Sequence, residues 1–258
     1  MILATHNHLP FLMTIEFFGT AGYHPCETRH TSCVFLPDAA PNAAFLLDAG
    51  TGFFRLIGRP LPSQLHIFLS HAHLDHTVGI TFLLDLIYSA KCEVTLHAEQ
   101  RVLDVVMQQF SETSLFPVAL PIKLAPISNN FQVEGVQIET FPLHHPGGSL
   151  GYVFSFSNGK RLAYVTDTAG GGDYFSRIEN VDLLIHERNF SDDLQELAQR
   201  SGHCTSADVA KVLRAATPKK AVLTHFNPLT LDENLDVDGL RDEFPDVVFA
   251  RDLMTFEV

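Results

Sequence analysis

The sequence predicts an α/β fold in which strands alternate with helices, and two patterns support this prediction. Apolar runs of strand length recur along the chain, separated by segments whose apolar residues follow helical spacing. Several of the strand-like runs are followed directly by Asp or His, and α/β folds gather reactive groups at strand ends. No internal repeat or Gly/Ser-rich linker interrupts the pattern. We therefore expect a single domain over residues 1–258.

The first twelve residues stand apart from this pattern. They contain no Lys or Arg ahead of their apolar residues, which is atypical of a signal peptide. Met13 comes just before the first convincing strand. We expect residues 1–12 to form a short N-terminal extension, and Met1 and Met13 both remain candidates for the natural start.

Strands and helices alternate in the first half of the chain. Apolar, β-branched and aromatic residues predict strands at 14–18, 32–36, 44–47, 65–69 and 94–97. Apolar residues at helical spacing predict helices over 77–90 and 99–110.

The second half begins with a predicted β-meander over 118–156, with Pro and Gly at its turns. Further strands are expected at 161–166, 181–185, 221–224 and 247–250. Ser191 is a candidate cap for a helix to residue 199, and Thr205 or Ser206 for a helix to residue 215. A last short helix is expected over 240–244.

Composition limits the classes of function. The chain has 17 Lys plus Arg against 30 Asp plus Glu, a net charge of −13, which disfavours binding to a long phosphate backbone. Its four cysteines show no C-x-x-C spacing, so we expect a reduced, cytoplasmic protein. No apolar run reaches 18 residues, so no membrane span is expected.

The strongest chemical signal is a cluster of metal-binding side chains directly after the strand at 65–69: His71, His73, Asp75 and His76. On a turn leaving a strand, His71 and His73 can point the same way, and Asp75 and His76 can face a second centre. Imidazole together with carboxylate suits Zn²⁺, Mn²⁺ or Fe better than Mg²⁺ or Ca²⁺. The cluster therefore predicts a hydrolase with two divalent metal ions, zinc first among them.

This run resembles the H-x-H-x-D-H signature of the metallo-β-lactamase superfamily, and three later motifs agree in order. They contain His145 before Pro-Gly-Gly, Asp167 after a strand, and His225 after a strand. The resemblance implies a four-layer αββα sandwich, with Asp48 supporting the metal loop by hydrogen bonds. It also implies one metal on His71, His73 and His145, a second on Asp75, His76 and His225, and Asp167 bridging them. His144 is the alternative to His145.

Further segments are similar to the ribonuclease Z and phosphodiesterase branch of that superfamily. They are Phe18-Gly19-Thr20-Ala21-Gly22, His186-Glu187-Arg188-Asn189-Phe190 and Gly202-His203-Cys204-Thr205-Ser206. The resemblance implies that His203 assists the leaving group, that Glu187 orients His203, and that Asp75 takes the proton of the attacking water. Arg188, Asn189 and Cys204 depart from the motifs of the branch. In the loop after the first strand, Arg29 and His30 are candidate substrate contacts.

Relatives in this branch that process tRNA carry a basic arm between the third-motif His and the bridging Asp. Here only residues 146–166 lie between them, and their sole basic residues are Lys160 and Arg161. We therefore expect a small anionic phosphodiester, such as a cyclic nucleotide or cyclic phosphate, attacked by a hydroxide that both metals share, and no long nucleic acid. Three alternatives stay open: a tRNA 3′-processing endonuclease, a thioester or lactone hydrolase, and a metal-containing binding or sensor protein. The resemblance also implies a homodimer.

Overall fold

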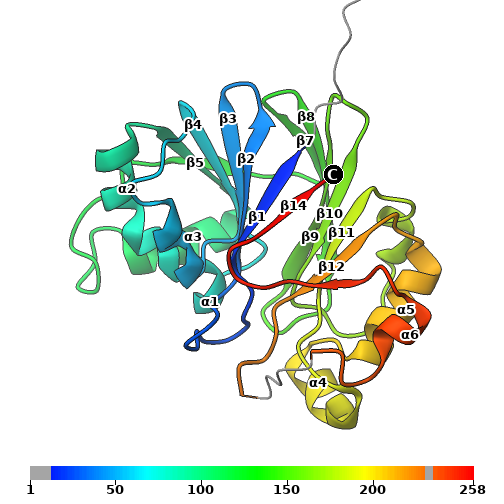
Figure 1. Ribbon diagram of the computed structural model, residues 1–258. Coiled ribbons are helices and arrows are strands. Elements are labelled where there is room, and N and C mark those ends of the chain that lie inside the picture. The colour runs from blue at the N-terminus through cyan, green and yellow to red at the C-terminus, as the bar shows by residue number, and fades with distance from the viewer. Residues whose placement is uncertain (1–12, 230–234) are drawn as a thin grey trace, which may run out of the picture.

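Two seven-stranded β-sheets pack face to face in the computed structural model, which describes residues 13–229 and 235–258 (Figure 1). The first sheet has the order β14-β1-β2-β3-β4-β5-β6. Its strands are β1 (Thr14–Gly19), β2 (Cys33–Ala40), β3 (Ala43–Leu47), β4 (Gln64–Phe68), β5 (Glu93–Ala98), β6 (Lys123–Pro126) and β14 (Met254–Glu257).

The second sheet has the order β13-β12-β11-β10-β9-β8-β7. Its strands are β7 (Asn130–Val133), β8 (Val136–Leu143), β9 (Ser149–Ser155), β10 (Arg161–Val165), β11 (Leu183–Glu187), β12 (Ala221–Thr224) and β13 (Val248–Phe249). In both sheets one part is antiparallel and the other parallel: β3 to β6 run parallel in the first, and β10 to β13 in the second. The carboxyl ends of parallel strands lie at one edge, so the loops that follow β4, β10 and β12 can meet there.

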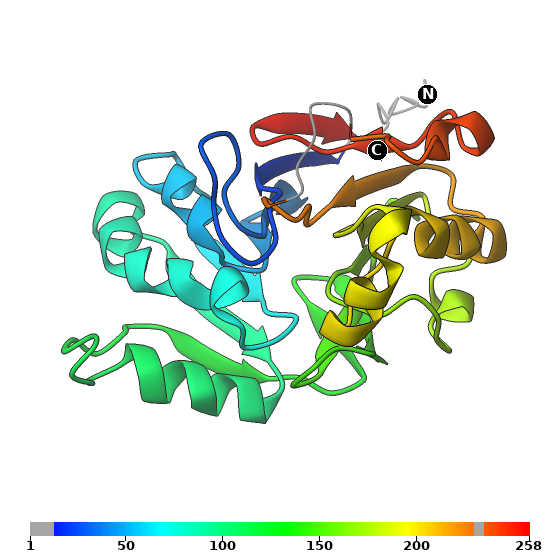
Figure 2. The same cartoon turned by 90° about the horizontal axis from the view of Figure 1, so that it is seen from below.

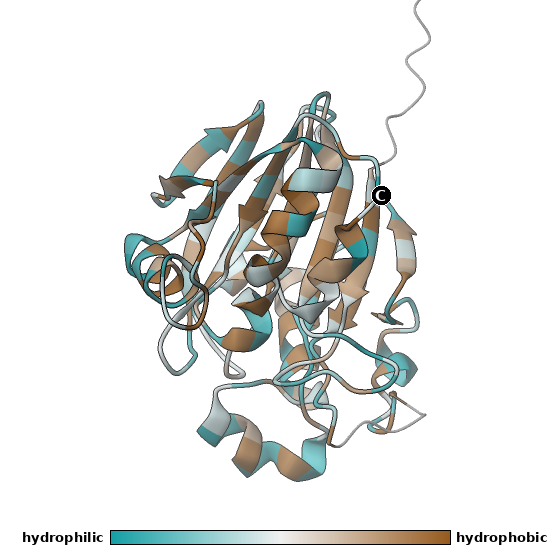
Figure 3. Cartoon of the chain, turned by 90° about the vertical axis from the view of Figure 1, so that its left-hand side faces the viewer, coloured by the Kyte–Doolittle hydropathy of each residue, from teal (hydrophilic) through white to brown (hydrophobic). Residues whose placement is uncertain are grey.

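The space between the sheets is filled by large apolar side chains. Phe45, Phe68 and Phe154 are fully buried and pack ring against ring, with Phe45 and Phe68 centroids 4.9 Å apart. Tyr152 and Tyr164 are equally buried, and their hydroxyls find acceptors at the Leu69 carbonyl and the Asp48 carboxylate. Figure 3 shows apolar residues along the strands and more hydrophilic residues on the loops.

Helices cover the outer face of each sheet (Figure 2). The first sheet is covered by η1 (Thr51–Leu56), α1 (Leu74–Thr77), η2 (Val78–Phe82), α2 (Leu83–Ala90) and α3 (Gln100–Phe110). The second is flanked by η3 (Phe175–Arg177), η4 (Asp192–Leu194), α4 (Gln195–Ser201), α5 (Ser206–Ala216) and α6 (Leu240–Glu243). The α5 residues Val209, Val212 and Leu213 pack onto this sheet. The four-layer αββα arrangement predicted from the sequence is confirmed.

The structure corrects several expected elements. The helix expected over 77–90 is interrupted by η2, where Gly79 packs so closely that a Cβ there would lie 2.4 Å from the Gly50 carbonyl oxygen. Strand β6 joins the first sheet and not the meander. Ser191 does not cap a helix, because its hydroxyl donates to Asp193 and the chain starts as the 3₁₀ turn η4. Thr205, in contrast, caps α5 as predicted.

The prediction for the start of the chain, residues 1–12, lies outside the described residues. Within the described part of the chain, no helix is long and apolar enough to span a membrane.

Candidate metal centre

The structure brings together all seven side chains that the sequence suggested as metal ligands. Four come from the first sheet: His71 and His73 lie in the loop after β4, and Asp75 and His76 in the short helix α1. Three come from the second sheet: His145 follows β8, Asp167 follows β10, and His225 follows β12. The site therefore lies where the two sheets meet at the carboxyl ends of their parallel strands.

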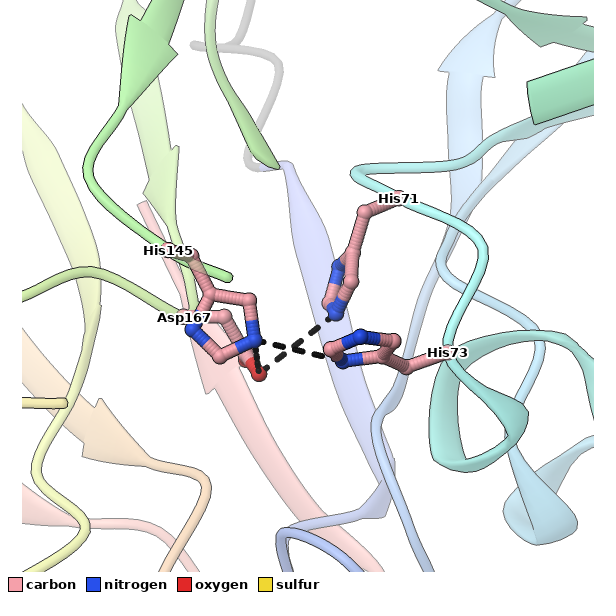
Figure 4. A group of neighbouring side chains, drawn as sticks. All are labelled: His71, His73, His145 and Asp167. Atoms are coloured by element: carbon pink, nitrogen blue, oxygen red, sulfur yellow. Dashed lines mark hydrogen bonds and ion pairs between the residues drawn. The ribbon is translucent and has the colours of Figure 1, made fainter. Parts of the chain in front are cut away.

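His71, His73, His145 and Asp167 form a first donor group, whose ligand atoms lie within 4.8 Å of one another (Figure 4). The His145 Nε2 is 3.2 Å from the His73 Nδ1 and 3.4 Å from the Asp167 Oδ2. The His71 Nε2 is 3.6 Å from the same carboxylate oxygen. His144, the alternative to His145, is exposed and belongs to neither donor group.

Asp75, His76, Asp167 and His225 form a second donor group. The Asp167 Oδ1 is 3.0 Å from the His225 Nε2 and 3.2 Å from the His76 Nε2. The Asp75 Oδ2 is 3.4 Å from each of these two nitrogens. Asp167 thus turns one carboxylate oxygen toward each group, which is the placement that a bridging ligand requires.

The outward-facing nitrogens of two of these imidazoles are held by acceptors. The His145 Nδ1 donates to the Gly202 carbonyl oxygen at 2.9 Å. The His76 Nδ1 donates to the Asp48 Oδ2 at 2.7 Å. Asp48 is fully buried and also accepts from the Ser70 N–H and the Tyr164 hydroxyl. These bonds place the proton on Nδ1 and leave Nε2 free to bind a cation.

Two observations indicate that the donor groups can bind divalent cations. The buried His71 Nε2 has no hydrogen-bond partner although it faces Asp167, so it needs a ligand of another kind. Burial, aided by His76, lowers the pKa of His71 well below its usual range, so this ring is a neutral donor. Burial raises the pKa of Asp167, but His225 and His76 outweigh it and hold that pKa well below normal, so the carboxylate is charged.

Three residues of the site adopt left-handed backbone conformations. The φ angles of Asp48, Asp167 and His225 are 57°, 48° and 60°. Asp48 and His225 directly follow β3 and β12, and a single residue separates Asp167 from the end of β10. For a residue other than glycine this region costs on the order of 1–2 kcal/mol. Residues keep such a strained conformation only where the surrounding structure enforces it, and residues of this kind cluster at functional sites.

His203 and Glu187 lie together beside the two donor groups. The His203 Nδ1 is 3.0 Å from the Glu187 Oε1, and the His203 ring stacks on the His225 ring at 5.3 Å. Glu187 is fully buried and also accepts from the Thr168 and Cys204 N–H groups. Burial lowers the pKa of His203, but the Glu187 carboxylate outweighs it and raises that pKa to about 9.

The three departures from the motifs of the branch have structural partners. Arg188 pairs with Asp238 at 3.0 Å, and the Asn189 side-chain amide lies 2.9 Å from the His225 Nδ1. The buried Cys204 thiol donates to the Thr168 carbonyl oxygen, and burial raises its pKa well above normal. Cys204 is therefore no reactive thiolate.

A cavity of about 490 Å³ opens over the donor groups. It is lined by Tyr23, His73, Leu74, Asp75, His145, Pro146, Asp167, Ser201, His203 and His225. The sequence analysis did not predict Tyr23, Leu74, Pro146 and Ser201 as cavity residues. The residues next to each of them in the sequence do not indicate that its side chain is exposed beside the site.

The structure places Arg29 and His30 away from this cavity, and the expected substrate contacts are corrected accordingly. Arg29 is only 5% exposed, and its guanidinium donates to the Ala250 carbonyl oxygen at 2.8 Å. The His30 Nδ1 lies 3.1 Å from the Thr51 hydroxyl, and its ring packs against Phe54. Both side chains contact the loop after β1 and its neighbours, and neither lines the cavity.

Comparisons with known proteins agree with this geometry. Residues 43–226 match the family described as Beta-lactamase superfamily domain. A Ribonuclease Z from Microcystis aeruginosa is 39% identical over 306 residues, covering 95% of this chain and 96% of the relative. Because that alignment is longer than the chain itself, the relative contains residues that this chain lacks.

Two solved structures share the fold. The metallo-beta-lactamase fold protein YhfI from Bacillus subtilis has a TM-score of 0.80 at 20% identity, covering 96% of this chain and 99% of its own. Human tRNase Z, short form, has a TM-score of 0.75 at 22% identity, covering 95% and 98%.

The chain belongs to the metallo-β-lactamase superfamily. Within it, the chain falls in the branch that contains the ribonuclease Z relatives and phosphodiesterase-like proteins. It is a metal-dependent hydrolase, and its fold implies divalent metal ions at the donor groups described above.

Proposed function

We propose that the chain hydrolyses a small phosphodiester, of the cyclic nucleotide or cyclic phosphate type, with two zinc ions. The observation that carries this proposal is the shared carboxylate of Asp167 between two donor groups, with the His203–Glu187 pair beside them in one cavity. Two-metal sites of this kind stabilise both the attacking and the leaving oxygen of an in-line displacement at phosphorus.

His71, His73 and His145 would hold one zinc ion and Asp75, His76 and His225 the other, with Asp167 between them. When bound, the two cations lower the pKa of a water and offset negative charge on the phosphoryl oxygens. Asp75 already accepts the Tyr23 N–H at 2.7 Å, and His76 and His225 outweigh burial and lower its pKa well below normal. We therefore assign Asp75 as a ligand rather than as the base that the sequence suggested.

His203 is the proposed general acid. Its Nδ1 is engaged by Glu187, which leaves Nε2 as the atom that donates a proton or hydrogen bond to the leaving oxygen. Glu187 fixes this tautomer and raises the basicity of the ring.

The segment between His145 and Asp167 favours a small substrate over a long RNA. Between His145 and Asp167 the chain forms only β9, β10 and their connections. The two basic residues of this segment are occupied, since Lys160 pairs with Asp182 and Arg161 donates to the Glu179 carbonyl oxygen. Long RNA binding depends on many phosphate contacts.

The second candidate is tRNA 3′ processing, favoured by the Ribonuclease Z from Microcystis aeruginosa. In that case a second copy of the chain or another protein would supply the basic surface.

The test is a panel of bis(p-nitrophenyl) phosphate, 2′,3′-cyclic nucleotides, a thioester, a lactone and a precursor tRNA, assayed with zinc-loaded protein. Turnover of the phosphodiesters alone supports the proposal, and cleavage of the precursor tRNA alone would replace it with the second candidate. His203→Asn should lower turnover of the 2′,3′-cyclic nucleotides, whose leaving group is an alkoxide, by about 10²–10⁴-fold while the metal content stays at the wild-type level. Full turnover of these cyclic nucleotides by the variant would exclude a leaving-group role.

A further inference from the structure

Two exposed apolar side chains flank the opening of the cavity. Tyr23 is 76% exposed and Leu74 65%, and both line the cavity beside the donor groups. Pro146 adds a third apolar surface at the same opening. Large apolar side chains left open to solvent next to a reactive centre indicate contact with a ligand.

The backbone around Tyr23 is fixed in place. Its N–H donates to the Asp75 carboxylate at 2.7 Å, and the preceding Gly22 N–H donates to the Phe226 carbonyl oxygen at 2.9 Å. Gly22 runs directly against the site, because a Cβ there would lie 2.4 Å from the His225 ring. The loop therefore holds the backbone of Tyr23 beside the donor groups, and the ring extends from this fixed point.

Tyr23 adopts this position at an energetic cost. Its φ angle is 64°, in the left-handed region that glycine and asparagine enter far more easily than tyrosine. If the position served only to form the backbone hydrogen bonds, a glycine would adopt this conformation at lower energetic cost. The aromatic side chain is thus the part that the position requires.

The charged side chains around the cavity limit the kinds of chemical group that the Tyr23 ring can bind. Among the described residues that line it there is no lysine or arginine. The nearby Arg101 is occupied, because it pairs with Glu99 at 2.7 Å and donates to the Gly147 carbonyl oxygen. A substrate with a second phosphate would find no lysine or arginine on this lining, whereas an uncharged planar group would find Tyr23, Leu74 and Pro146.

We propose that Tyr23 is the platform on which a planar aromatic substituent of the substrate phosphodiester, such as a nucleobase, stacks. This inference rests on the proposed function and adds a specificity-determining residue to it. Stacking of a base on an aromatic side chain changes affinity by about 5- to 150-fold, so about tenfold is expected for a partly exposed ring.

The experiment compares two substrates with the same p-nitrophenolate leaving group: thymidine 5′-(p-nitrophenyl phosphate) and methyl p-nitrophenyl phosphate. Tyr23→Ala should lower kcat/KM for the thymidine compound by about tenfold and for the methyl compound by less than about twofold. Tyr23→Phe should keep the wild-type ratio, because the ring remains. Tyr88→Ala removes a tyrosine that is 82% exposed on α2, away from the cavity, and should change neither value.

Equal losses on both substrates, or no loss on either, would overturn the inference. Metal analysis of each variant separates a stacking role from a disturbance of Asp75, since the Tyr23 N–H remains in all of them. If wild-type protein hydrolyses neither compound, the proposed function fails on its own. Calorimetric binding of thymidine 5′-monophosphate then still decides the inference, because Tyr23→Ala must weaken it by a similar factor and Tyr88→Ala must not.

Discussion

Replacing Asp48 with Asn tests how the second donor group is oriented. The Asp48 Oδ2 accepts from the His76 Nδ1 at 2.7 Å and from the Tyr164 hydroxyl at 2.8 Å, and Oδ1 accepts from the Ser70 N–H at 2.7 Å. An amide offers one acceptor oxygen in place of two. Since the Ser70 N–H cannot reverse its role, the amide nitrogen would face His76.

A donor facing the His76 Nδ1 favours the tautomer with its proton on Nε2, and that nitrogen then cannot bind a metal. Loss of such an orienting partner lowers metal affinity by about 10- to 100-fold. One hydrogen bond to a charged group is lost as well, so the unfolding free energy of the metal-free protein should fall by about 1.5–3 kcal/mol.

Competitive titration with a chromophoric chelator measures the zinc affinity of Asp48→Asn, and urea denaturation of metal-free protein measures its stability. Tyr164→Phe is the matched control, because it removes one donor to the same carboxylate and leaves the charge and the His76 contact intact. It should cost about 1.5–3 kcal/mol of stability without a comparable loss of affinity. Unchanged zinc affinity in Asp48→Asn, together with the stability loss, would refute the tautomer argument.

Two further predictions concern the shared ligand and the core. Asp167→Ala removes the carboxylate common to both donor groups, so elemental analysis should find neither metal. Retention of one full equivalent of metal would show that Asp167 does not bridge. Burial lowers the pKa of His97 to about 3, so below pH 6.5 the unfolded chain binds a proton that the folded chain does not. The unfolding free energy should therefore fall by about 1.6 kcal/mol between pH 6.5 and 5. Urea denaturation of the metal-free wild type and of His97→Phe at both pH values measures this fall. An equal fall of the unfolding free energy in both proteins would show that His97 does not cause it.

The sequence predicted most elements whose own residues carry the signal. Strand β4 is apolar and bounded by polar residues, and the capping box at Thr205 and Asp208 is a local motif. Strand β14 was not predicted. It has only four residues, and it forms by pairing with β1 at the other end of the chain. Strand β6 was misplaced for the same reason: its partner β5 lies before a long connection, and pairing between distant segments leaves no local pattern.

The cluster from His71 to His76 was predictable as a candidate metal site because it places four imidazole and carboxylate groups after one strand. His145, Asp167 and His225 were predicted from the resemblance to the superfamily. The alternative between His144 and His145 needed the structure, which shows which ring faces Asp167. Arg29 was expected to contact the substrate, but it is buried and donates to the Ala250 carbonyl oxygen. Tyr23 was not predicted as a site residue, although it lines the cavity with its backbone in a left-handed conformation.

The ligands come from two sheets, and Asp75 and His225 are 150 positions apart in the chain. Metal ions bound there would act as removable cross-links that close a very long loop, so they would slow the separation of the two halves of the sandwich. Chelation should consequently make the backbone amides of the loops after β4 and β12 exchange their hydrogens sooner than those of the strands.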